Sequence, residues 1–157
     1  MKQNKQELAA VFMEPVTRGI APEHGYLKAV REITKEHKVP LVFDEVVTGF
    51  RFTSGGVEKY WGVPADMIIL GKIIGGGLPA GAVVTSREML DPLEVKRVDG
   101  VKVEGPEVFL GGTYNGHPLA MAAGLAALHE LSQEQYTHLN DLGTSLRKGM
   151  DSRHRRQ

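Results

Sequence analysis

Three short apolar runs predict the strands of a buried sheet. They cover Leu8–Met13, Leu41–Phe43 and Met67–Leu70. None of them alternates polar and apolar residues, so neither face of these strands is expected to be solvated. Runs of this kind are typical of parallel sheets that carry helices on both faces. A further strand is predicted over Gly81–Ser86.

Helical spacing of apolar residues separates the first two strands. Leu27, Val30 and Ile33 recur on one face of a helix predicted over Tyr26–His37, and the charged residues between them predict a solvated opposite face. Further helices are predicted near Val57–Trp61, over Leu119–Leu131 behind Pro118, and over about Gln133–Met150. Strands that alternate with helices predict an α/β fold with right-handed crossovers.

Two charged residues follow two of these strands. Lys72 comes directly after Met67–Leu70 and Gly71, and Asp44 comes directly after Leu41–Phe43. Lysine is rarely buried, and ligands of open α/β sheets bind outside the carboxyl ends of the strands. If the two strands are parallel, the amine and the carboxylate share one edge of the sheet. The pattern therefore favours a cofactor site with Lys72 as its reactive amine.

Composition argues against several other classes of function. The 157 residues include 19 Lys plus Arg and 19 Asp plus Glu, so no net charge attracts nucleic acid or an anionic membrane. There is no cysteine, and the six histidines match no ligand spacing, so neither thiolate chemistry nor a metal site is expected. Lys72 lacks the Ser or Thr that follows a P-loop lysine, and GKIIGGG does not match the dinucleotide fingerprint G-x-G-x-x-G.

Three longer segments resemble one enzyme family. They are DEVVTGFR (44–51), GVPADMIILGKIIGGGLPAGA (62–82) and GGTYNGHPLAMAAGLAAL (111–128). Together they resemble the class III aminotransferases, which are pyridoxal-phosphate (PLP) enzymes of fold type I, and the resemblance covers roughly residues 9–149. It implies the three-layer α/β fold of the PLP-binding large domain, with an antiparallel strand over Gly81–Ser86. The segment LGKIIGGGLPAGA is most similar to the glutamate-1-semialdehyde 2,1-aminomutases.

The resemblance implies a role for each candidate site residue. Lys72 is the catalytic residue that forms a Schiff base with PLP, and pyridoxamine phosphate is the other form of the cofactor. Asp44 hydrogen-bonds the pyridine nitrogen and keeps it protonated, and Val46 packs on the ring face. Thr113, preceded by Gly112, binds the cofactor phosphate of the neighbouring subunit in a homodimer.

Purely structural roles stay open for some of these residues. The alternative for Asp44 is a helix N-cap or a turn former, and Val47 is the alternative to Val46. The alternative for Thr113 is that it caps the following helix together with Asn115.

Other residues near the predicted site are weighed in the same way. Glu14 is expected either beside the cofactor, as the resemblance implies, or in a structural hydrogen bond. A structural ion pair is preferred for Arg51 over a substrate carboxylate. Tyr60 and Trp61 are expected to pack rather than to stack on the cofactor.

Class III aminotransferases are much longer than this chain. Residues 1–150 are therefore expected to form the central and C-terminal part of the large domain, incomplete, with a basic tail over 151–157. The resemblance implies a cytoplasmic enzyme that acts on a small amino or keto acid. The isolated chain is expected to expose an apolar sheet face and to be inactive alone. The alternatives are an ω-amino acid or ornithine-type transaminase and a non-catalytic fragment or association module.

Overall fold

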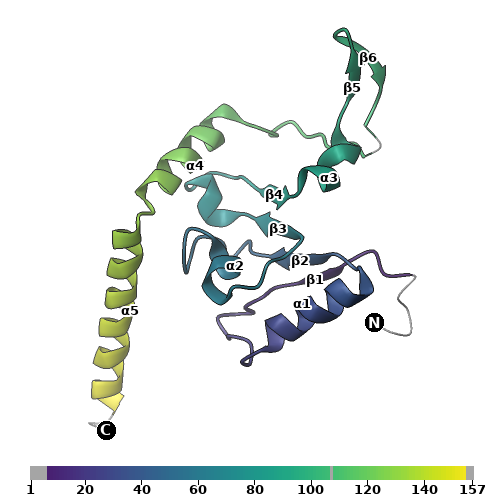
Figure 1. Cartoon of the computed structure of the whole chain (residues 1–157). Coiled ribbons are helices and arrows are strands. Elements are labelled where there is room, and N and C mark those ends of the chain that lie inside the picture. The colour runs from purple at the N-terminus through teal and green to yellow at the C-terminus, as the bar shows by residue number, and fades with distance from the viewer. Residues whose placement is uncertain (1–6, 107, 155–157) are drawn as a thin grey trace.

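A four-stranded sheet forms the centre of the computed structural model, which describes residues 7–106 and 108–154 (Figure 1). Its strands are β1 (Val11–Met13), β2 (Leu41–Asp44), β3 (Met67–Leu70) and β4 (Ala82–Thr85), in the order β1-β2-β3-β4. The pairs β1–β2 and β2–β3 are parallel, and β4 runs antiparallel to β3. The predicted parallel sheet and the antiparallel direction of the last strand are thus confirmed.

The two parallel pairs are connected through helices, as parallel strands require. Helix α1 (Tyr26–His37) joins β1 to β2, and the short helix α2 (Gly56–Trp61) joins β2 to β3. The core lies between these helices and one face of the sheet. Its fully buried side chains are those of Leu41, Phe43 and Val57.

The charged face of α1 is exposed as predicted except at Arg31, which is partly buried. Arg31 of α1 donates two hydrogen bonds to the carboxylate of Asp66, at 2.5 and 3.0 Å. Asp66 also accepts a hydrogen bond from the backbone N–H of Leu41, at 2.8 Å. The Arg31 guanidinium lowers the pKa of Asp66 below its usual range. This pair ties α1 to the amino ends of β2 and β3.

The opposite face of the sheet is partly open to solvent. On this face Phe12 of β1 is 62% exposed and Val83 of β4 is 51% exposed. All four residues of β3 are only partly buried, although the sequence predicted a fully buried strand. The exposed apolar sheet face that the sequence predicted is therefore seen in the structure.

The hairpin of β5 (Lys96–Val98) and β6 (Val101–Glu104) and the helix α5 (Gln133–His154) extend away from the sheet (Figure 1). The 3-10 helix η1 (Lys72–Gly75) follows β3, and α3 (Arg87–Leu90) and η2 (Asp91–Leu93) follow β4. The β5–β6 hairpin is separate from the four-stranded sheet. Helix α4 (Pro118–Glu130) comes next and lies against η1.

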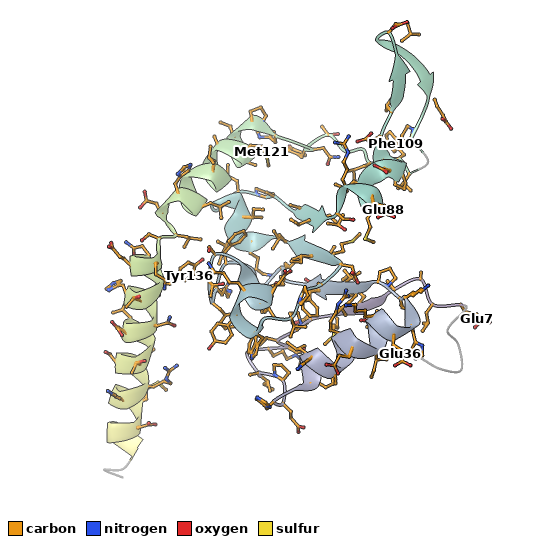
Figure 2. The ribbon with its side chains drawn as sticks, in the orientation of Figure 1. Glu7, Glu36, Glu88, Phe109, Met121 and Tyr136 are labelled. Atoms are coloured by element: carbon orange, nitrogen blue, oxygen red, sulfur yellow. The ribbon has the colours of Figure 1, made fainter. Side chains whose placement is uncertain are left out.

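The last helix, α5 (Gln133–His154), is four residues longer than predicted and attaches through its first turn. Tyr136 is 4% exposed and donates a hydrogen bond to the carbonyl oxygen of Phe50 at 2.9 Å (Figure 2). Burial raises the pKa of this phenol. Of the predicted basic tail, residues 155–157 lie outside the described residues. Within the described ranges, no helix combines the length and apolar character needed to cross a membrane.

Candidate active site

Asp44 and Lys72 lie at the same edge of the sheet. Asp44 is the last residue of β2 and pairs with Ile69 of β3, and Lys72 follows Ile69 by three positions. Because β2 and β3 are parallel, both residues emerge at the carboxyl edge, as the sequence predicted. Lys72 is exposed and has a φ of 49°, in the left-handed region that non-glycine residues seldom occupy. Such strained positions cluster at functional sites.

The Asp44 carboxylate is half-buried and keeps one oxygen available. Its Oδ1 accepts a hydrogen bond from the backbone N–H of Val46 at 3.0 Å, and this is the one hydrogen bond of its side chain within the described residues. The geometry is that of a turn in which an Asp side chain bonds the backbone two residues on. Asp44 thus forms the turn that was predicted as the alternative to a cofactor-binding role. Its Oδ2 nevertheless remains available for a ligand.

The turn after β2 packs directly on the end of β3. A Cβ atom added to Gly71 would lie 3.1 Å from Val46 Cγ1, and one added to Gly49 would lie 2.7 Å from Leu70 Cδ2. A side chain at Gly49 would collide with its neighbours, and one at Gly71 would require Val46 to shift by a few tenths of an ångström. Val46 therefore lies beside the residue that precedes Lys72, whereas Val47 is 44% exposed.

Glu45 is a buried residue of this site to which the sequence analysis assigned no role. It is 1% exposed, and its Oε2 accepts hydrogen bonds from Val57 N–H at 2.9 Å and Thr48 Oγ1 at 3.1 Å. Burial raises its pKa above the usual range. No local pattern signalled this burial, because the partner Val57 is twelve residues away.

Helix α4 supports the 3-10 helix that begins at Lys72. A Cβ atom on Gly76 would overlap the carbonyl group of Ala123, and one on Gly124 would overlap the carbonyl oxygen of Ile74. The two backbones therefore touch, which only glycine permits at these positions. This contact joins the second and third sequence motifs.

The segment with Gly112 and Thr113 forms an exposed turn before α4. The N-cap residue of α4 is His117, which makes no side-chain cap hydrogen bond, so the alternative that Thr113 and Asn115 cap the helix was wrong. Among the described residues, no hydrogen bond joins this turn to Asp44 or Lys72. Within one chain the third motif thus contacts the second through α4, while the described hydrogen bonds leave the turn of Gly112 and Thr113 apart from Asp44 and Lys72.

The remaining candidate residues are exposed or make contacts within their own segment. Glu14 is exposed, and the described residues offer it no structural hydrogen bond. Arg51 Nε donates to the carbonyl oxygen of Val47 at 2.5 Å, and the ion pair preferred for it is not formed within the described ranges. Tyr60 and Trp61 pack against each other and against Phe52, as predicted. No group of three potential metal ligands occurs in the part of the chain that the structure describes.

The fold is part of the large domain of the fold type I PLP-dependent transferases, and this defines the class of protein. An omega-transaminase from Sphaerobacter thermophilus superposes with a TM-score of 0.86 at 37% identity, over 99% of this chain and 35% of that chain. A transaminase with PLP bound superposes with a TM-score of 0.82 at 28% identity, over 96% of this chain and 35% of that chain. The predicted fold class is confirmed.

The sequence relatives identify the family. The family model of the class-III aminotransferases matches residues 1–157, and the chain belongs to this family. The glutamate-1-semialdehyde 2,1-aminomutase of Alkaliphilus oremlandii is 44% identical over 154 residues, which are 95% of this chain and 34% of that protein. The chain spans about a third of the length of the curated relatives it matches.

Proposed function

We propose that this chain is the lysine-bearing part of a PLP-dependent enzyme that transfers an amino group. The substrate class proposed first is glutamate-1-semialdehyde, because the aminomutase of Alkaliphilus oremlandii matches 95% of the chain. The observation that carries the proposal is the common edge of β2 and β3, where a carboxylate, an apolar side chain and an amine lie together. The family implies PLP as the cofactor.

The residues at this edge fit a pyridoxal ring. Asp44 keeps Oδ2 available for a protonated ring nitrogen, and Val46 offers an apolar surface beside Gly71, which has no side chain to obstruct a flat ligand. Lys72 follows Gly71 directly, and its side chain is exposed. When bound, the cofactor supplies an electron sink for carbanion chemistry. Asp44 then strengthens that sink by its charge, and Lys72 binds the cofactor and moves the proton at the substrate carbon.

Thr113 and Gly112 are proposed as phosphate ligands of a neighbouring subunit. Their turn is exposed, and the side chain of Thr113 does not cap α4. A hydroxyl and free N–H groups before a helix N-terminus suit a phosphate. Because the described contacts do not join this turn to Lys72, the assignment requires a homodimer.

The test is chemical labelling of the chain. It is incubated with PLP, reduced with borohydride, which fixes the cofactor on any amine that has condensed with it, and then mapped by peptide mass spectrometry. The expected result is label on Lys72 and its loss in Lys72→Arg. Lys38→Arg is the matched control, because Lys38 is also exposed and has a left-handed φ of 55° but follows α1. Label spread evenly over the surface lysines would refute the assignment.

An ω-transaminase is the second candidate, favoured by the Sphaerobacter thermophilus structure. The chain covers 35% of that enzyme and 34% of the aminomutase. The two candidate functions use the same sheet edge and differ in their substrate. The two are separated by supplying glutamate-1-semialdehyde and an ω-amino acid to the full-length enzyme that contains this chain. A non-catalytic association module, the third candidate, predicts that Lys72 is not labelled selectively.

A further inference from the structure

Glu45 stands in the sequence between the two residues proposed to face the cofactor ring, and its carboxyl is buried. Glutamate is almost never fully buried unless it is paired, yet Glu45 is 1% exposed and neither of the chain's described salt bridges involves it. Its Oε2 is satisfied by Thr48 Oγ1 and by the N–H of Val57, in the first turn of α2. The carboxyl therefore joins the turn after β2 to the start of the next helix.

The surroundings of this carboxyl leave no space for another arrangement. Gly56 has a φ of 57°, and a Cβ atom there would lie 2.5 Å from Glu45 Oε2 and 2.8 Å from Oε1. The backbone of Gly56 thus packs directly against the carboxyl group. Glycine is required there both by its left-handed φ and by this contact.

The backbone of Glu45 is fixed as firmly as its side chain. Its N–H donates to the carbonyl oxygen of Ile69 at 2.9 Å, and its carbonyl oxygen accepts from Gly49 N–H at 2.8 Å. Glu45 is thus the last residue bonded to β3 and the first residue of the turn. Side chains alternate along an extended strand, and Glu45 continues the inward side of Leu41 and Phe43, so Asp44 is turned to the other face.

We infer that Glu45 is a positioning residue, which holds Asp44 and Val46 in place for the cofactor by anchoring their turn to α2. The inference rests on the proposed function of this edge. Without the Glu45 side chain, the Val57 N–H loses its acceptor and the turn is released from α2. The hydrogen bond from Val46 N–H to Asp44 Oδ1 then opens more often, and the carboxylate loses its fixed direction.

Hydrogen exchange tests this in the chain without cofactor. Glu45→Ala is expected to speed exchange of the Val46 amide about tenfold, the effect of losing one buried hydrogen bond. The Leu41 amide, bonded to Asp66 at the other end of β2, is expected to change little. Glu45→Gln keeps a carbonyl acceptor of the same shape and is expected to restore slow exchange at Val46.

Asp66→Ala is the matched control, because, like Glu45→Ala, it removes a carboxylate that accepts a backbone hydrogen bond, here from Leu41 of β2. It is expected to speed exchange at Leu41 and to leave Val46 unchanged. Equal acceleration of both amides in Glu45→Ala would show a general structural role and overturn the inference, as would an unchanged Val46 amide.

Cofactor capture provides the second arm. In Glu45→Ala, the PLP concentration for half-maximal borohydride labelling of Lys72 is expected to rise about tenfold, while Glu45→Gln and Asp66→Ala stay near the unmodified chain. Unchanged capture in Glu45→Ala would overturn the positioning role. Failure of the unmodified chain to label Lys72 would instead refute the proposed function, since the exchange measurement needs no cofactor.

Discussion

Gly124→Ala tests whether α4 determines the position of Lys72. Gly124 is buried within α4, and an added Cβ would overlap the carbonyl oxygen of Ile74 in η1, the 3-10 helix that starts at Lys72. Both groups belong to the backbone, so neither can rotate away. Carbon and oxygen atoms need more than 3 Å between them, and η1 must therefore retreat from α4 on the order of 1 Å.

The magnitude follows from comparison with a second helical glycine. Gly143 of α5 has nothing within 4 Å of its added Cβ, so Gly143→Ala is expected to gain about 0.8–1 kcal/mol from helix propensity alone. Gly124→Ala has the same gain in propensity but also forces extra volume into a packed contact, which costs about 1–3 kcal/mol. Because two rigid backbones collide, we expect the upper end, a difference of about 3 kcal/mol between the two variants.

Urea unfolding followed by circular dichroism measures this difference. With a slope of about 2 kcal/mol per molar urea, the midpoint of Gly124→Ala is expected about 1.5 M below that of Gly143→Ala. Labelling of Lys72 by PLP and borohydride is expected to weaken in Gly124→Ala and to stay unchanged in Gly143→Ala. Equal midpoints and equal labelling would refute the conclusion that α4 supports η1.

Four further predictions follow from the same contacts. Asp44→Asn is expected to leave Lys72 labelling in place but to move the pH titration of the bound cofactor's absorbance to lower pH, because a neutral amide no longer favours a protonated ring nitrogen; an unchanged titration would make Asp44 only a turn residue. Arg31→Gln is expected to cost about 1 kcal/mol or less at neutral pH, since the pair is partly exposed. Because the pKa of Asp66 is lowered by Arg31, this stability is present above the ordinary value of 3.8 and is lost as the pH falls through the folded-state pKa, so urea midpoints of the two proteins should converge in acid. For Glu45 the dependence of stability on pH has the opposite sign. Burial raises its pKa, so its contribution to stability is present below pH 4.5 and is lost as the pH rises through the folded-state pKa. Glu45→Gln should remove this fall in stability. The chain is expected to self-associate in sedimentation because Phe12 and the α5 residues Leu139, Leu142, Leu146 and Met150 are more than half exposed, and a monomer at every concentration would contradict this.

The strands and helices were predictable because their signals are local. Apolar runs predicted β2 and β3, and helical spacing predicted α1 with the same bounds as in the structure. The shared edge of Asp44 and Lys72 followed from these runs, since parallel strands end together. The burial of Glu45 and the Arg31–Asp66 pair were not predictable in this way. Both depend on how segments 12 to 35 residues apart meet in space, which single-residue patterns do not encode.

The glycines around Lys72 are explained by close packing rather than by loop flexibility. At Gly49, Gly71, Gly76 and Gly124 an added Cβ would meet a neighbour at 3.1 Å or less, whereas at Gly77 it would meet nothing within 4 Å. At Gly49, Gly76 and Gly124 one of these neighbours is a backbone oxygen, which has no rotamers that could absorb a change, whereas at Gly71 the neighbour is the side chain of Val46. The edge is therefore sensitive to a single added methyl group at Gly49, Gly76 and Gly124, where a backbone atom lies in the way.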